Sequence, residues 1–272
     1  MFQEGKSASV RAHRIVFANE KGGSGKSTSA VHVAIALASA GRKVAALDMD
    51  TRQRTLGRYL DNRAAMAKSL DRELPMVRYE TFDAARSGPV AERIEALADR
   101  MDVIVIDTPG NDNESVRAAI ASADTLVTPI NDSFVDLDLI GQVHPETFKV
   151  TRPSFYAEIV WDARKARAKQ DGATVDWIVL RNRLQHLEAR NMKRVAAALG
   201  ELSKRVGFRT IPGLSERVIY RELFPKGLTL LDLGAIGNET GMAHIAARQE
   251  LRELIAGLQL PMLETTKVAE PA

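Results

Sequence analysis

The sequence contains no cysteine, which excludes disulfides, thiolate zinc sites and cysteine-ligated iron–sulfur clusters. No apolar run approaches the roughly 18 residues of a membrane-spanning helix. The first fourteen residues lack the apolar core of a signal peptide, so we expect a cytoplasmic protein. The 38 Lys and Arg nearly balance the 35 Asp and Glu, giving a net charge of +3. Nucleic-acid binding must therefore be argued from where the basic residues lie.

Hydrophobic strand patterns alternate with helical patterns along the chain. Residues 103–106 are four consecutive β-branched residues, which suit a central parallel strand covered on both faces. Further strands are expected at 15–18, 43–47, 76–79, 125–130, 176–180 and 208–211. The alternation predicts an α/β fold, a single doubly wound and mostly parallel sheet with helices on both faces. We expect one domain over residues 14–260, with flexible tails at 1–13 and 261–272.

A glycine-rich segment follows the first strand and opens a helix. It consists of Glu20, Lys21, Gly22, Gly23, Ser24, Gly25, Lys26, Ser27 and Thr28. Strand, glycine loop and helix are the context of a phosphate-binding loop, in which backbone N–H groups and the helix N-terminus hold an anion. There Lys26 reaches the terminal phosphates and the Ser27 hydroxyl binds Mg²⁺. The standard pattern fails at its first glycine, which is Glu20, and a second lysine, Lys21, precedes the glycine pair.

Three aspartates end two of the expected strands at the carboxyl edge of the sheet. Asp107 stands where P-loop proteins keep the carboxylate that holds Mg²⁺. Two carboxylates beside a triphosphate repel it unless a metal or a water lies between them. Asp50 is therefore the candidate for holding the attacking water, and Asp48 for supporting the metal or the loop. The alternative is that Asp48 and Asp50 are strand-end caps.

The choice of base is partly readable from the segment after the strand at 176–180. A guanine site of the N-K-x-D type needs a carboxylate, and residues 182–185 contain none. The Asn182 amide can still pair with adenine, as amides do with that base. The sequence therefore favours ATP over GTP.

Basic residues gather on one helical face near the C-terminal third of the chain. Five of them span about 120° of a helix, with apolar residues opposite: Arg190, Lys193, Arg194, Lys204 and Arg205. Possible extensions are Arg164, Lys165, Arg167, Arg217 and Arg221. These residues predict binding to DNA phosphates without sequence preference, and the alternative is an ordinary solvated helix face.

A C-terminal amphipathic segment and the two tryptophans are expected to pack on the protein core. Residues 242–258 place apolar residues on one helical face and mixed charges on the other, which favours a helix docked on the core over a membrane-binding helix. We therefore expect no membrane partner. Both tryptophans, Trp161 and Trp177, are expected in the core.

The segment from Lys21 to Ser27 resembles the deviant Walker A loop of the ParA/MinD family of P-loop ATPases. Residues 107–110 resemble that family's Walker B and switch II segment. The resemblance implies that Lys21 acts in trans on the nucleotide of a dimer partner. It also implies that Lys26 and Ser27 act in cis and that Asp50 positions the hydrolytic water.

Residues 131–136, 179–184 and 217–225 are similar to the MipZ group within that family. This resemblance implies a slow, switch-type, Mg-dependent ATP hydrolase that forms ADP and phosphate and dimerises on ATP. It further implies nonspecific DNA binding, a nucleoid-associated polar gradient, ParB as a partner, and regulation of division-site placement by inhibiting FtsZ polymerisation. The alternatives are a ParA-type chromosome or plasmid partition ATPase and a metabolic P-loop enzyme, and Lys21 argues against the last.

Overall fold

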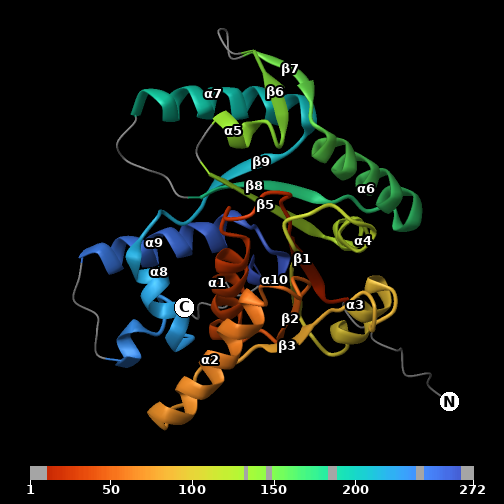
Figure 1. Ribbon diagram of the computed structural model, residues 1–272. Helices are drawn as coiled ribbons and strands as arrows, with labels where there is room; N and C mark the ends of the chain where they lie inside the picture. Colours follow the sequence, from red (N-terminus) through yellow and green to blue (C-terminus); the bar gives the residue numbers. More distant parts are fainter. Residues whose placement is uncertain (1–10, 132–133, 145–148, 183–188, 237–241, 265–272) are drawn as a thin grey trace, which may run out of the picture.

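The computed structural model describes residues 11–131, 134–144, 149–182, 189–236 and 242–264. Seven strands form the central sheet in the order β3-β2-β4-β1-β5-β8-β9, and every pairing in it is parallel (Figure 1). The strands are β1 (His13–Phe17), β2 (Val44–Asp48), β3 (Arg78–Thr81), β4 (Val103–Asp107), β5 (Thr125–Asn131), β8 (Asp176–Asn182) and β9 (Arg209–Pro212). The predicted fold class is confirmed.

Helices cover both faces of this sheet because its strands are apolar on both sides. In β1, Ile15 and Phe17 enter one core and Val16 enters the other. The first core is closed by α1 (Lys26–Ser39), α2 (Thr55–Leu70), α8 (Val218–Leu223) and α9 (Met242–Gly257). The second is closed by α3 (Val90–Ala98), α4 (Glu114–Ser122), α6 (Phe155–Asp171) and α7 (Ala189–Val206). Shorter elements are α5 (Phe134–Leu137), α10 (Pro261–Glu264), and the 3₁₀ turns η1 (Phe224–Lys226) and η2 (Leu233–Ile236).

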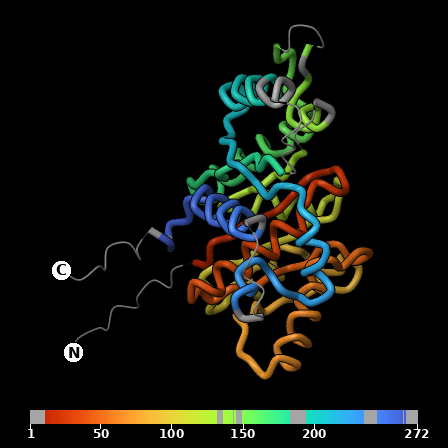
Figure 2. The backbone as a smooth tube through the Cα atoms, turned by 90° about the vertical axis from the view of Figure 1, so that its left-hand side faces the viewer, coloured from red at the N-terminus to blue at the C-terminus, as the bar shows by residue number. Residues whose placement is uncertain are grey.

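An antiparallel hairpin of β6 (Gly141–Val143) and β7 (Val150–Pro153) was not predicted from the sequence. Its strands are too short for a clear alternation of apolar and polar residues. The hairpin packs closely on α7, because a Cβ at Gly141 would lie 2.5 Å from Leu202 Cδ2. Figure 2 shows α7 and the hairpin at one end of the molecule and α2 at the other. We call α5, α7 and the hairpin the α7 lobe.

Three expectations about the periphery meet different outcomes. In α9, Ala247, Leu251 and Leu254 are buried, which confirms docking on the core. Trp177 is buried, but Trp161 is 58% exposed on α6, so its expected core position was wrong. β1 begins at His13 and α10 covers Pro261–Glu264, so these ends of the expected tails belong to the fold, and residues 1–10 and 265–272 lie outside the described part. None of the described helices is both long and apolar enough to cross a membrane.

Candidate nucleotide site

The glycine-rich segment forms a loop between β1 and α1, at the carboxyl edge of the sheet. Gly25 caps the start of α1 with φ +88°, a conformation that side chains disfavour. A Cβ there would also lie 2.7 Å from Asn182 Nδ2, so the position requires glycine. The first amides of α1 consequently face the loop without side-chain caps, which suits an anion.

The amines of the two lysines in the loop contact different partners. Lys26 is buried, and its Nζ donates to the Lys21 carbonyl at 2.9 Å. Burial lowers the pKa of Lys26, while Asp107 and Asp50 oppose that shift. Lys21 instead points out of the loop, and its Nζ donates to Asp136 Oδ1 at 3.1 Å. Asp136 comes from α5, and the sequence pattern gave no signal that it would meet Lys21.

Asp107 ends β4 and is fully buried beside the loop. Neither of its carboxylate oxygens receives a hydrogen bond of ordinary geometry. Burial raises the pKa of Asp107 to about 7, and the nearby Ser27 hydroxyl and Lys26 oppose the rise. A buried carboxylate with two unsatisfied oxygens beside a serine hydroxyl fits a divalent cation, which would supply the missing partners.

Asp48 ends β2 in register with Asp107 on β4, and Asp50 follows it two residues later. Both Asp48 oxygens are used, because Oδ1 accepts from the Asp50 amide at 3.0 Å and Oδ2 accepts from the Gly57 amide at 2.9 Å. Asp48 therefore supports the loop between β2 and α2. Asp50 is half-buried and caps that loop through Oδ1, which accepts from the amides of residues 52 and 53. Its Oδ2 has no such role among the hydrogen bonds of the described residues.

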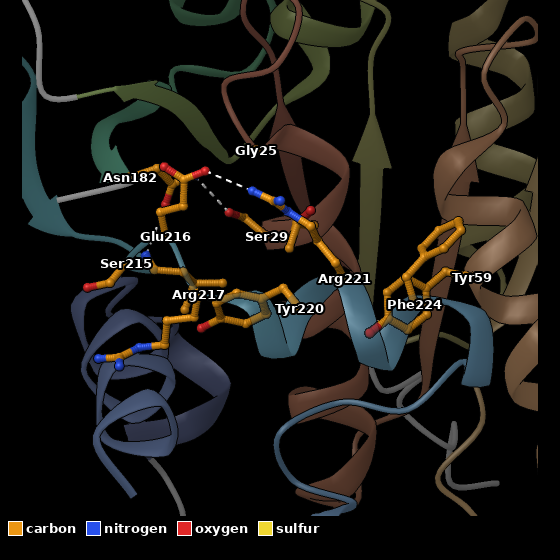
Figure 3. A pocket seen from close by; sticks show the side chains of 12 residues that line it. Gly25, Ser29, Tyr59, Asn182, Ser215, Glu216, Arg217, Tyr220, Arg221 and Phe224 are labelled. Carbon is orange, nitrogen blue, oxygen red and sulfur yellow. Dashed lines mark hydrogen bonds and ion pairs between the residues drawn. The ribbon is translucent and has the colours of Figure 1, made fainter. Parts of the chain in front are cut away.

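A cavity of about 320 Å³ opens beside the first turn of α1. It runs from Gly25, Thr28 and Ser29 to three aromatic residues that the sequence did not single out, namely Tyr59, Tyr220 and Phe224 (Figure 3). An aromatic cavity that continues from a phosphate loop has the shape and polarity of a base site. Only the folded chain could reveal it, because its walls come from α1, α2, α8 and the segment after β9.

Asn182 lines this cavity, but its amide is engaged within the protein. Its Nδ2 donates to the Ser24 carbonyl at 3.0 Å and to Ser29 Oγ at 3.2 Å, and its Oδ1 accepts from the Leu214 amide at 3.0 Å. These bonds tie the phosphate loop to the end of β8. Any pairing with adenine would have to use the second lone pair of Oδ1.

A second cavity, of about 700 Å³, separates residues 49–53 from residues 109–115. Asp50 lies on one wall, and Pro109, Gly110 and Asn111 lie on the other. Gly110 approaches the phosphate loop closely, since a Cβ there would stand 3.3 Å from the Gly22 amide nitrogen. The segment after Asp107 therefore touches the loop on one side and this cavity on the other.

The structure divides the expected DNA-contacting residues into exposed and structural ones. Arg194, Lys204 and Arg205 are exposed on α7, and Val195, Leu199 and Leu202 are buried beneath them, which confirms the amphipathic pattern. Arg205 also pairs with Glu201 and donates to the Val150 carbonyl of the hairpin at 2.9 Å. Arg190 and Lys193 belong to α7, but their side chains lie outside the described part.

Three of the proposed extensions are used by the fold itself. Arg167 is only 4% exposed and pairs with Asp124 and Asp171, so its expected place on a DNA surface was wrong. Arg164 donates to the carbonyls of residues 175, 206 and 207. Arg217 pairs with Glu250. Lys165 remains exposed beside Asp162, and Arg221 lines the 320 Å³ cavity.

A glycine loop opening α1 and a buried aspartate ending the neighbouring strand define a P-loop nucleotide-binding protein. A family model for the ATPase MipZ matches residues 13–262. The chain therefore belongs to the MipZ ATPase family, within the ParA/MinD type of P-loop ATPases.

Curated relatives match a part of the chain. An uncharacterized ATP-binding protein of Methanocaldococcus jannaschii is 30% identical over 142 residues, which cover 45% of this chain and 54% of the relative. The septum site-determining protein MinD of Synechocystis is 28% identical over 158 residues, which cover 48% of this chain and 59% of the relative. The chain thus spans little more than half the length of the curated relatives it matches.

Solved structures share the fold over most of their length. The cell division ATPase MinD of Pyrococcus furiosus has a TM-score of 0.58 and 18% identity, covering 91% of this chain and 99% of that one. The ATP complex of a D38A variant of McdA from Cyanothece has a TM-score of 0.56 and 17% identity, covering 89% and 96%. At such identities the likeness shows the fold alone.

Proposed function

We propose that the chain is an Mg-dependent ATPase switch that dimerises on ATP. In this dimer Lys26 would act on the nucleotide bound to the same subunit, and Lys21 would act on the nucleotide bound to the partner subunit. Lys26, Ser27 and the amides of the glycine loop would hold the phosphates, and Ser27 and Asp107 would hold Mg²⁺. The cation would neutralise charge on the phosphates. Asp50 would orient the attacking water. Asp48 would keep Asp50 in place, because the Asp48 carboxylate accepts a hydrogen bond from the backbone amide of Asp50.

The observation that carries this proposal is that the amines of the two lysines contact different parts of the protein. Lys26 lies buried in the loop, whereas Lys21 reaches the protein surface and pairs with Asp136. A lysine held outside its own phosphate loop can reach a second nucleotide brought against that surface. Such a charge would act as an arginine finger does in trans.

Light scattering on size-separated protein tests the assignment. Lys21→Ala should still bind ATP but should lose the ATP-dependent dimer and its turnover. Asp136→Asn is the matched variant, because it weakens the resting partner of Lys21 and leaves the lysine in place. It should retain the dimer. An ATP-dependent dimer in Lys21→Ala would overturn the role in trans.

We also propose that the dimer binds DNA through the exposed basic residues of α7, and Lys165 could extend this surface. One helix offers few phosphate contacts, and nonspecific binding is weak, about 10⁻⁴ to 10⁻⁶ M at physiological salt. Pairing two such helices in a dimer would raise avidity by roughly 10²–10⁴ if both reach the duplex. ATP would thus control retention on DNA, which is the basis for proposing a nucleoid-associated protein.

Within the family, the proposed role is regulation of division-site placement, with FtsZ as the target and ParB as the polar partner. The alternative is a ParA-type partition ATPase. Sedimentation of FtsZ polymers with and without this protein and ATP separates the two. Loss of polymer on adding the ATP-bound protein supports the first role, and unchanged polymer together with DNA binding supports the second.

A further inference from the structure

An ion pair between Glu216 and Arg221 lies at the 320 Å³ cavity beside the phosphate loop. Arg221 Nη2 donates to Glu216 Oε1 at 3.1 Å, and both residues line the cavity together with Thr28 and Ser29 of α1. Figure 3 shows Arg221 extending from α8 toward Glu216, with the pair marked by a dashed line. Neither the family pattern nor the spacing of charges in the sequence had connected this pair with the nucleotide.

The backbone on either side of Glu216 is fixed. The amide and hydroxyl of Ser215 both donate to Glu250 on α9, at 3.0 and 2.9 Å. Arg217 also donates to Glu250. Because both neighbours are anchored to the same carboxylate, Glu216 is held facing the cavity.

Arg221, in contrast, is free to change partners. Ile219 and Leu223 are buried and hold α8 against the core, which leaves Arg221 on the opposite, exposed side. Its side chain is 75% exposed and that of Glu216 is 40% exposed. An ion pair so open to water contributes little to stability, so a ligand can replace it at little cost.

We propose that Arg221 is a nucleotide-binding residue that exchanges Glu216 for the phosphate next to the ribose, and that Glu216 competes with this phosphate in the empty site. This inference rests on the proposed nucleotide function. Thr28 directly follows the loop and lines the same cavity as Arg221 and Glu216, so a phosphate held beside Thr28 would face the cavity that both charged side chains line. A guanidinium binds a phosphate with two parallel charge-assisted hydrogen bonds, which its single bond to Glu216 does not match.

Competition against a fluorescent ADP measures the affinities for ATP, ADP and adenosine. Arg221→Ala should weaken ATP and ADP by at least about fivefold, as expected when a hydrogen bond to a charged group is removed, and change adenosine by less than about twofold. Glu216→Gln should tighten ATP and ADP. In the Arg221→Ala background Glu216→Gln should have no effect, because the competition requires both side chains. Arg221→Lys should fall between Arg221→Ala and the parent.

Lys226→Ala is the matched control, since it removes one exposed positive charge from the same segment without touching the cavity. If Arg221→Ala binds ATP as Lys226→Ala does, the inference is wrong. A loss confined to DNA affinity would likewise overturn it and return Arg221 to the DNA surface. Failure of the parent protein to bind ATP at all would instead refute the proposed function.

Discussion

The nucleotide site and the α7 lobe both carry functional charge, but they hold it in opposite ways. In the site, Asp107 is fully buried with both oxygens unsatisfied, and Ser24 Oγ is buried without a partner among the described residues. In the lobe, Arg194 and Lys204 stand on an exposed helix face whose opposite side packs on the core. Unsatisfied buried groups cost stability and are kept where a ligand completes them. Exposed charges cost the fold little stability, and their effect on a bound ligand is the sum of many small contributions.

This comparison predicts that single substitutions in the site have large and specific effects, whereas those in the lobe have small effects that depend on salt.

Asp107→Asn should have the largest effect. It removes the carboxylate charge at nearly constant shape, so Mg²⁺ should no longer strengthen ATP binding and turnover should be lost. The folded carboxyl holds its proton up to about pH 7, whereas an unfolded one, with a pKa of 3.8, has already lost it. The contribution of the Asp107 carboxyl therefore lowers the free energy of unfolding more and more as the pH rises from about 4 to 7, and it reaches its full size above pH 7.

At pH 8 the Asn variant without nucleotide should consequently be more stable than the parent, by about 1 kcal/mol or more. Calorimetric titration with ATP, with and without Mg²⁺, and denaturant unfolding measure the two effects. An Asn variant that keeps its Mg²⁺ response would show that Asp107 is not the metal ligand.

Asp50→Ala should slow hydrolysis by roughly 100-fold or more, the usual contribution of a group that positions or accepts a proton. ATP binding and the ATP-dependent dimer should persist, giving a long-lived dimer. Asp50→Asn can keep the cap on the amides of residues 52 and 53, so it separates a catalytic role from a structural one.

Glu114→Gln is the control, because Glu114 is another carboxylate on the 700 Å³ cavity. It should turn over ATP normally, as followed by phosphate release. If both Asp50 variants hydrolyse at the parent rate, the role moves to Asp48.

His32 tests the buried side of the comparison through stability. Its ring packs edge-on against Tyr59 and Tyr220, which line the 320 Å³ cavity. Its Nδ1 lies 2.9 Å from the Thr28 carbonyl oxygen, and its buried Nε2 has no partner among the described residues. Burial lowers its pKa from 6.5 to about 4. The unfolded chain therefore binds a proton below pH 6.5 that the folded chain refuses until about pH 4.

Stability should fall across that window by about 3 kcal/mol on account of this residue. In His32→Phe this part of the acid loss should disappear, and in the control His144→Phe it should remain. Urea unfolding at pH 7 and pH 5 measures both variants and should show about 2 kcal/mol of this loss, because pH 5 covers only the upper part of the window. An equal acid loss in the parent and in His32→Phe would contradict the burial argument.

The features that could be predicted from the sequence are those that depend on local patterns, and those that could not depend on packing between distant parts of the chain. Strands, the glycine loop and the strand-end aspartates are local patterns, and the structure places Lys26, Asp48 and Asp107 together as the pattern implied. The aromatic cavity and the Lys21–Asp136 pair join elements far apart in the chain, and no local pattern marks them.

Errors arose where a residue type was assigned a role without its packing. Arg167 was expected to bind DNA, but it is buried against Asp124 because an arginine can satisfy helix-end carbonyls, here that of Ala123, and carboxylates inside a fold. Trp161 was expected in the core, but it falls on the solvent side of α6. Charge and size alone do not show which face of a helix turns inward.

The smallest effect should come from the lobe. Arg194→Ala combined with Lys204→Ala removes two exposed charges from α7 and should change unfolding free energy by less than about 0.5 kcal/mol. Affinity for DNA should fall on every sequence, and the dependence of log K on log salt should flatten by about one for each phosphate that the variant no longer neutralises. ATP turnover should be unchanged. Lys68→Ala with Arg86→Ala removes the same charge from exposed positions outside the α7 lobe, one on α2 and one in the segment after β3. Fluorescence anisotropy over a salt series compares the two double variants with the parent. If the two double variants bind DNA with equal affinity, the basic face of α7 is only a solvated helix face. The nucleotide site and the α7 lobe would then differ in how deeply their charges are buried, and the lobe would have no function in DNA binding.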